Sequence, residues 1–146
     1  MIELGDEKVL YAFDKELEPA LVVPSGTTVR VRTKDCFGNQ VQRPEDELDE
    51  IDWDHINPAT GPIFVEGAVP GGALKVTIEA IEFDGQTASC TGEGEGVCGD
   101  RFDAWSTHLC KIDGDELVWD EELRIPLRPM IGVIGVAPAG EPVNCG

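Results

Sequence analysis

Glycine and proline divide this chain into short segments, and this sets the strongest limit on its fold. The 146 residues contain seventeen glycines and ten prolines, and both residue types interrupt helices. Between these breaks, apolar residues alternate with polar ones, as they do in half-buried strands. We therefore expect an all-β protein with many short strands and few helical residues.

The alternation predicts eight strands. In the clearest of them, Leu74–Phe83, the side chains of Leu74, Val76, Ile78 and Ala80 share one face. The dipeptide Asp113-Gly114 separates two of the predicted strands and is typical of a hairpin turn. The predicted strands are Val9–Phe13, Ala20–Val23, Thr27–Thr33, Ile63–Glu66, Leu74–Phe83, Thr107–Ile112, Glu116–Trp119 and Met130–Val136.

One segment, Pro44–Trp53, has the pattern of a helix instead. Pro44 suits the first position of a helix, and the acidic residues that follow it interact favourably with the helix dipole. Leu48 and Ile51 lie three positions apart, so one or two helical turns are expected. Because the chain has no evident linker or repeat, we predict a single domain over residues 1–146, a two-sheet β-sandwich with one short helix.

The charge of the chain disfavours two classes of partner. Twenty-nine acidic and eleven basic residues give a net charge of −18, whereas nucleic acids and anionic membrane surfaces attract clustered Lys and Arg. No apolar stretch approaches the roughly 20 residues of a membrane-spanning helix, and the first residues do not resemble a signal peptide. We therefore expect a cytoplasmic protein that binds neither nucleic acid nor membrane.

The cysteines and histidines carry weak signals. Five cysteines without a CxxC pair argue against a disulfide scaffold or a zinc knuckle, so reduced, packed thiols are expected. His55 and His108 lie far apart in the sequence, and for each we favour a hydrogen-bonded structural role over that of a ligand or base. The stretch Gly92–Gly96 carries two carboxylates, which disfavour phosphate, so it is interpreted as a loop tip.

A few polar residues lie among apolar residues and glycines. Asp35 follows a predicted strand and Glu66 ends one, and strand ends that open into loops often carry site residues. Asn57 lies in a turn, and Glu141 lies within the apolar C-terminal run. From the residues alone two interpretations stay open: a functional site, or strand-end caps and ion pairs to neighbouring basic residues.

Five segments, in this order along the chain, resemble the acetamidase/formamidase family. The most specific are N-P-A-T-G-P-I-F-V-E-G-A and M-I-G-V-I-G-V-A-P-A-G-E. The resemblance implies a β-rich, jelly-roll-like fold and the hydrolysis of short aliphatic amides, such as formamide or acetamide, to carboxylate and ammonia. Some similar proteins open lactams instead. The five segments are Tyr11–Asp14, Pro19–Gly26, Thr33–Gln40, Asn57–Ala68 and Pro129–Glu141.

The resemblance also implies a site. Asp35 and Glu66 are expected to be catalytic carboxylates and metal ligands, with Asn57 and Glu141 in contact with the amide substrate. The implied cofactor is a divalent metal ion, zinc or else calcium or magnesium, that activates a water molecule. His55 and His108 lie in no matching motif and receive no role.

The resemblance covers only the N-terminal half of the family pattern. Family chains continue past the segment that ends at Glu141 into a His-Gly-Gly-Asn motif, which this sequence does not contain. We therefore expect the fold and the activity to need a C-terminal half, present as a separate chain or as a missing segment, within a homo- or hetero-oligomer. The alternative is a non-catalytic β-domain, a structural or ligand-binding chain that retains the fold.

Overall fold

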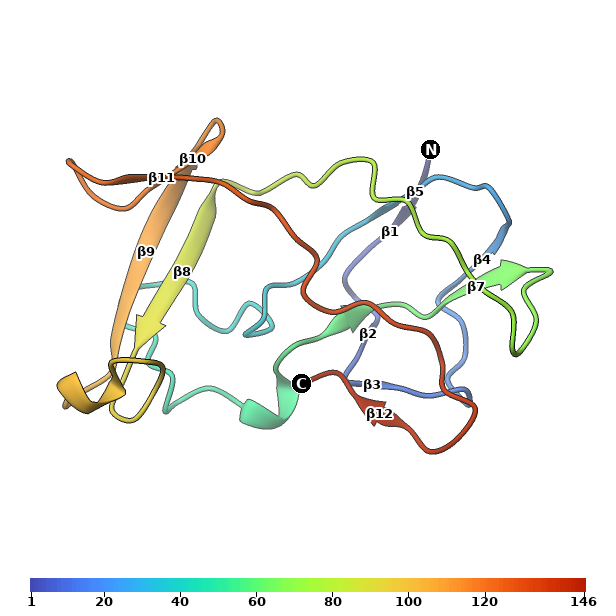
Figure 1. Ribbon diagram of the computed structural model, residues 1–146, viewed down its shortest axis with the longest axis horizontal. Helices are drawn as coiled ribbons and strands as arrows, with labels where there is room; N and C mark the ends of the chain where they lie inside the picture. The colour runs from blue at the N-terminus through green and yellow to red at the C-terminus, as the bar shows by residue number, and fades with distance from the viewer. The chain divides into compact units, whose positions relative to one another are not determined.

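The computed structural model describes residues 1–146 and consists almost entirely of short strands and turns (Figure 1). This confirms the predicted all-β fold. Its helices are two three-residue 3-10 turns, η1 (Trp53–His55) and η2 (Gly99–Arg101), and neither has the length or apolarity to cross a membrane. The strands are β1 (Ile2–Leu4), β2 (Val9–Leu10), β3 (Ala12–Phe13), β4 (Leu21–Pro24), β5 (Val29–Val31), β6 (Ala59–Thr60), β7 (Ile63–Glu66), β8 (Gln86–Thr91), β9 (Ser106–Asp113), β10 (Glu116–Val118), β11 (Arg124–Pro126) and β12 (Val143–Asn144).

The chain forms two compact units. Unit 1 contains residues 1–38, 53–78 and 131–146, and unit 2 contains residues 39–52 and 79–130. The strands are distributed over five sheets, four of two strands in unit 1 and one of four strands in unit 2.

Unit 1 combines parallel and antiparallel strand pairs. Strands β1 and β5 pair in parallel, as do β4 and β7, whereas β2 with β6 and β3 with β12 pair antiparallel. Strand β4 shows why the alternation predicts a strand, because Val23 is buried and its neighbour Val22 is exposed. Leu4 and Val23 are the buried apolar residues of this unit.

Unit 2 is built on one antiparallel sheet with the strand order β11-β10-β9-β8. Strands β9 and β10 form the hairpin predicted at Asp113-Gly114, with Asp113 opposite Glu116. Gly114 has a φ of 60°, a conformation that glycine adopts without steric cost. Val41, Leu48 and Cys110 are buried and form the core of this unit.

Truncation of Leu48 is expected to destabilise the chain. Its side chain is buried in unit 2, so Leu48→Ala removes apolar contacts and leaves a cavity. The free energy of unfolding should fall by about 2–3 kcal/mol, measured by urea unfolding. Leu123→Ala is the matched control because Leu123 is exposed, and its effect should stay within about 0.5 kcal/mol.

The helix predicted over Pro44–Trp53 is wrong. The structure has separate turns there, closed by the N–H groups of Asp46 and Glu50 on the carbonyls of Arg43 and Glu47. The Asp46 carboxylate instead accepts hydrogen bonds from the N–H groups of Gln42 and Arg43, at 2.8 and 2.9 Å. Short acidic side chains compete in this way for backbone donors and favour turns over helices.

This turn adds a pH-dependent contribution to stability. Hydrogen bonds from the Gln42 N–H and the Arg43 side chain lower the pKa of Asp46 below its ordinary value of 3.8. Because the folded pKa is the lower one, the ionised carboxylate stabilises the fold above pH 3.8, and the effect is lost as pH falls through the folded value. Asp46→Asn should therefore be less stable than the wild type at pH 6, and the difference should shrink as the pH is lowered below 3.8. Urea unfolding as a function of pH measures this difference, and a pH-independent difference contradicts the prediction.

Six of the eight predicted strands overlap strands of the structure, namely β2 to β5, β7, β9 and β10, whereas β1, β6, β8, β11 and β12 were not predicted. The other two predictions, Leu74–Phe83 and Met130–Val136, are wrong. Both segments lack a paired strand, although their apolar pattern is that of a strand. A strand needs a neighbour to accept its backbone hydrogen bonds, and neither segment has one. The alternation missed β8, Gln86–Thr91, because most of its side chains are polar.

Candidate functional site

Asp35 lies in a turn that follows β5 and is exposed. Its Oδ1 accepts a hydrogen bond from the Phe37 N–H at 3.0 Å, and its carbonyl accepts one from the Gly38 N–H at 3.0 Å. The carboxylate is therefore held at the strand end by the backbone of the residues that follow it. Asp35 therefore fits both interpretations that the sequence left open. Its carboxylate caps the turn, and it is also exposed to solvent, where a site residue could act.

Asn57 lies beside the Asp35 turn. Its backbone N–H donates to the Cys36 carbonyl at 2.7 Å, which joins two segments of the family motifs. Asn57 has a φ of 51°, in the left-handed region that few residues other than glycine and asparagine enter. The following Pro58 normally restrains its predecessor to extended conformations. The conformation of Asn57 is thus unusual, and such residues concentrate at functional sites.

Contacts in unit 1 join three further residues that sequence reasoning did not select, namely Tyr11, His55 and Cys145. The ring of His55, in η1, meets the ring of Tyr11 edge-on, with centroids 4.8 Å apart. The N–H of Cys145 donates to the Tyr11 carbonyl at 2.9 Å. These residues are far apart in the sequence, and their spacing carries no signal of this proximity. Only the folding of unit 1 brings them together.

Glu66 and Glu141 lie apart from these contacts. Glu66 is the last residue of β7, opposite Pro24 of β4, and its exposed carboxylate has no hydrogen-bond partner. The Thr60 hydroxyl donates to the Arg32 carbonyl at 2.8 Å. This bond joins the residue after β5 to the end of β6. Glu141 is exposed in the loop before β12. The convergence of Asp35 and Glu66 in one coordination sphere stays a prediction.

The residues of this chain do not fit a divalent metal ion by themselves. No three His, Cys, Asp or Glu side chains of residues 1–146 lie close enough together to hold one. Zinc sites in proteins use three or four such side chains, and calcium sites use six to eight oxygen ligands. A metal centre therefore requires ligands that this arrangement does not supply.

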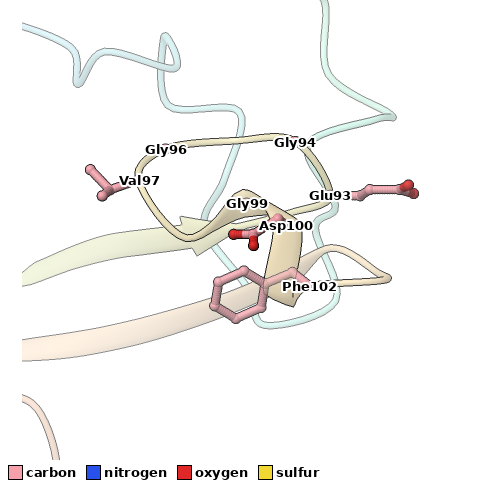
Figure 2. Close-up of a pocket in the computed structure, with 7 residues that line it drawn as sticks. All are labelled: Glu93, Gly94, Gly96, Val97, Gly99, Asp100 and Phe102. Atoms are coloured by element: carbon pink, nitrogen blue, oxygen red, sulfur yellow. The ribbon is translucent and has the colours of Figure 1, made fainter.

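The cavity of unit 2 lies in the loop between β8 and β9. Its volume is about 480 Å³, and its lining includes Glu93, Val97, Asp100 and Phe102. Figure 2 shows the side chains of Glu93 and Val97 pointing away from the loop on opposite sides. The two carboxylates that line the cavity, Glu93 and Asp100, do not converge, and the cavity shows no pairing of groups suited to hydrolysis.

His108 has the structural role that the sequence predicts. Its Nε2 donates to the Trp119 carbonyl at 2.7 Å, and its ring stacks on that of Trp119 with centroids 4.4 Å apart. Burial raises the pKa of the Cys110 and Cys145 thiols. A raised pKa lowers the population of the reactive thiolate. Cys36, beside the candidate site, and Cys98 are exposed, so the expectation of packed thiols is wrong for these two residues.

Comparison with known proteins identifies the fold. The Acetamidase/Formamidase family model matches residues 4–144, whereas no curated protein matches the chain. An acetamidase structure from Bacillus halodurans is 40% identical with a TM-score of 0.85, over 98% of this chain and 48% of that chain. A structure from Thermoanaerobacter tengcongensis, described as a predicted acetamidase/formamidase, is 46% identical with a TM-score of 0.92, over 99% and 48%.

An acetamidase structure from Yersinia enterocolitica is 20% identical and has the same fold, with a TM-score of 0.74 over 98% of this chain and 48% of that chain. The chain thus spans about half the length of the solved relatives that it matches. The predicted family is confirmed by the family match over nearly the whole chain and by two structures at 40% identity or more. This chain belongs to the acetamidase/formamidase family.

Proposed function

We propose that this chain forms part of an amidohydrolase that converts short aliphatic amides, such as formamide or acetamide, to carboxylate and ammonia. The observation that carries this proposal is the similarity to the Thermoanaerobacter structure along 99% of the chain. Because relatives are about twice as long, the proposed activity belongs to an assembly of this chain with the other half of the family fold.

Amides resist hydrolysis because the nitrogen lone pair donates into the carbonyl group. An enzyme must polarise the carbonyl oxygen, deliver a water molecule and protonate the departing ammonia. In the proposed site Asp35 or Glu66 is the general base that takes a proton from water, a role worth about 10²–10⁴-fold in rate. Asn57 and Glu141 contact the substrate, and the Asn57 side-chain amide matches an amide substrate because it offers both a donor and an acceptor.

The proposed divalent cation, zinc or else calcium or magnesium, is assigned to the assembled protein. Asp35 and Glu66 are oxygen donors, which suit each of these ions, but this chain does not bring three ligands together. The remaining ligands are therefore assigned to the other half. When bound, such an ion supplies polarisation of a carbonyl oxygen and activation of water.

The test offers formamide, acetamide and a small lactam to this chain assembled with the other half. Ammonia release is measured for the two linear amides, and ring opening is measured for the lactam. Release from a linear amide supports the proposal and identifies the substrate class. Ring opening of the lactam, detected by mass spectrometry as the addition of one water molecule, assigns the chain to the lactam-opening members. A folded assembly inactive on all three favours the alternative of a non-catalytic β-domain.

Cys36 is expected not to act as a nucleophile. Its thiol is exposed beside Asn57, but nucleophilic cysteines need an adjacent base that lowers their pKa, and no histidine motif accompanies Cys36. Cys36→Ser should keep amide hydrolysis within about threefold of the wild-type rate. Loss of activity with one equivalent of iodoacetamide, with the label mapped to Cys36, contradicts this prediction.

A further inference from the structure

The chain contains two Asp-Gly dipeptides, and they lie in different structural settings. Asp113-Gly114 lies at the turn between β9 and β10, whereas Asp84-Gly85 lies outside the strands, directly before β8 (Figure 1). Asp-Gly is a dipeptide prone to isomerisation of the aspartate, because glycine has no Cβ to hinder attack by its backbone nitrogen. The two dipeptides therefore provide a comparison within one molecule.

The isomerisation joins the aspartate side chain to the backbone. The glycine nitrogen attacks Cγ of the carboxyl group and forms a C–N bond, while the hydroxyl of the carboxyl group leaves with the nitrogen's proton as water. The product is a five-membered succinimide ring. Water then adds to one of the two ring carbonyls and breaks one C–N bond, which gives either the original aspartate or isoaspartate. The reaction thus needs no partner other than water.

No contact restrains the reacting groups of Asp84-Gly85. The Asp84 side chain is exposed, and its carboxylate forms no hydrogen bond or ion pair. The Gly85 N–H has no acceptor, whereas the Gly85 carbonyl accepts the Ile112 N–H at 2.9 Å. Exposed backbone outside a sheet opens at little cost in free energy. The Gly85 nitrogen and the Asp84 carboxyl group can therefore meet without breaking any contact of the fold.

Asp113-Gly114 is restrained at its aspartate. Asp113 is the last residue of β9 and lies opposite Glu116 of β10. Its carboxylate accepts a hydrogen bond from Nη1 of Arg124 at 3.1 Å, within an ion pair. Ring closure here must break this ion pair and rotate Asp113 out of the extended backbone of the strand. Because the opening of paired strands costs more free energy than the movement of an exposed loop, this dipeptide should react more slowly.

We propose that Asp84 is a modification site, at which the folded chain forms isoaspartate while Asp113 stays unmodified. The partner that such a site fits is a methyltransferase that acts on isoaspartyl carboxyl groups, because Asp84 lies in an exposed segment outside the sheet. This proposal is independent of the proposed amidase function.

The modification changes the start of the β8–β9 pairing. Isoaspartate inserts one carbon atom into the main chain directly before Gly85, whose carbonyl accepts the Ile112 N–H. The side chain of the next residue, Gln86, donates to the Gln42 carbonyl at 3.2 Å. Hydrogen exchange of the Ile112 amide should therefore accelerate by about tenfold in the modified chain. Unchanged exchange at Ile112 in that fraction would overturn this effect on the pairing.

The test is an ageing experiment on the whole purified chain at neutral pH and physiological temperature. Isoaspartate is located by mass spectrometry with electron-transfer fragmentation. It is also counted by methyl transfer from S-adenosylmethionine with a purified isoaspartyl methyltransferase. Asp84→Glu is the diagnostic variant, because glutamate would have to form a six-membered ring, which closes more slowly. Asp113→Glu is the matched control at the other dipeptide.

In the folded chain, Asp84 should accumulate at least about tenfold more isoaspartate than Asp113. Asp84→Glu should abolish methyl uptake by the folded chain, and Asp113→Glu should leave it unchanged. In a sample unfolded in urea, the two dipeptides should react at rates that agree to within about threefold, because neither is then held by the fold.

Equal amounts of isoaspartate at the two positions of the folded chain would overturn the proposal, as would methyl uptake that survives Asp84→Glu. A difference that persists in urea would overturn it as well, because the flanking sequence rather than the fold would then select Asp84. None of these measurements requires the other half of the family fold or amide hydrolysis.

Discussion

Removal of the charge at Glu66 is expected to abolish amide hydrolysis by the assembled enzyme without unfolding this chain. The side chain is exposed at the end of β7 and has no hydrogen-bond partner in the structure, so its carboxylate contributes nothing evident to stability. A general base is worth about 10²–10⁴-fold in rate. Glu66→Gln keeps the size of the side chain and should lower kcat/KM by at least about 100-fold. Glu18→Gln, at another exposed glutamate, is the control and should retain the full rate.

Asp35 is tested by the corresponding substitution to asparagine. Asp35→Ala removes the acceptor of the Phe37 N–H as well as the charge, so a loss of activity with alanine has two explanations. Asp35→Asn retains the amide oxygen as an acceptor and removes the charge alone. It should melt like the wild type and lose activity by at least about 100-fold. Full turnover in both Asp35→Asn and Glu66→Gln removes these carboxylates from the mechanism.

The alternation in the sequence predicted strands only where the folded chain provides a neighbour. Thr107–Ile112 and Glu116–Trp119 are linked by the Asp113-Gly114 turn, which brings the neighbour with it, and both are strands in the structure. Leu74–Phe83 has a stronger apolar pattern but no such neighbour. Strand propensity describes how a side chain fits a sheet rather than a preference of the backbone alone. The prediction therefore failed where the structure provides no paired neighbour.

The helix prediction failed for a local reason. The acidic residues of 44–53 were interpreted as partners of a helix dipole, yet Asp46 uses its carboxylate to accept two N–H groups of a turn. Aspartate offers both options, and the sequence pattern does not distinguish them. Strand β8 was missed because a polar strand at the edge of a sheet carries little alternation to detect.

For the candidate site, sequence motifs identified residues but not their neighbours. The Asp35 and Asn57 motifs meet through the hydrogen bond between the Asn57 N–H and the Cys36 carbonyl. The contact of Tyr11 with His55 depends on the fold of unit 1 and leaves no trace in spacing. His55 lies two residues before the left-handed Asn57, so this aromatic–imidazole contact adjoins a residue of the family motif.

The second large effect concerns the chain on its own, which is expected to release no detectable ammonia from formamide or acetamide. It brings no three metal-ligating side chains together, and its solved relatives are about twice as long. Adding the other half should raise the rate by more than about 10³-fold, because a general base and the groups that polarise the carbonyl act as a unit and lose most of their effect when separated. Ammonia release, measured with and without the other half at equal concentration of this chain, tests the prediction.

Two controls make the comparison specific. The other half alone must be inactive, and its mixture with the Glu66→Gln chain must assemble as the wild type does while releasing ammonia at least about 100-fold more slowly. A Glu66→Gln complex that forms but releases no ammonia shows that Glu66 acts in the chemical step. A complex that does not form shows that the substitution disturbs the association of the two halves. If the isolated chain sediments as a monomer, melts cooperatively and hydrolyses amides at the rate of the mixture, it holds a complete site, and the need for the other half is refuted. Physically, this outcome would require Asp35 or Glu66 to act beside donors of unit 1 alone, and His55 and Asn57 are then the groups to substitute next.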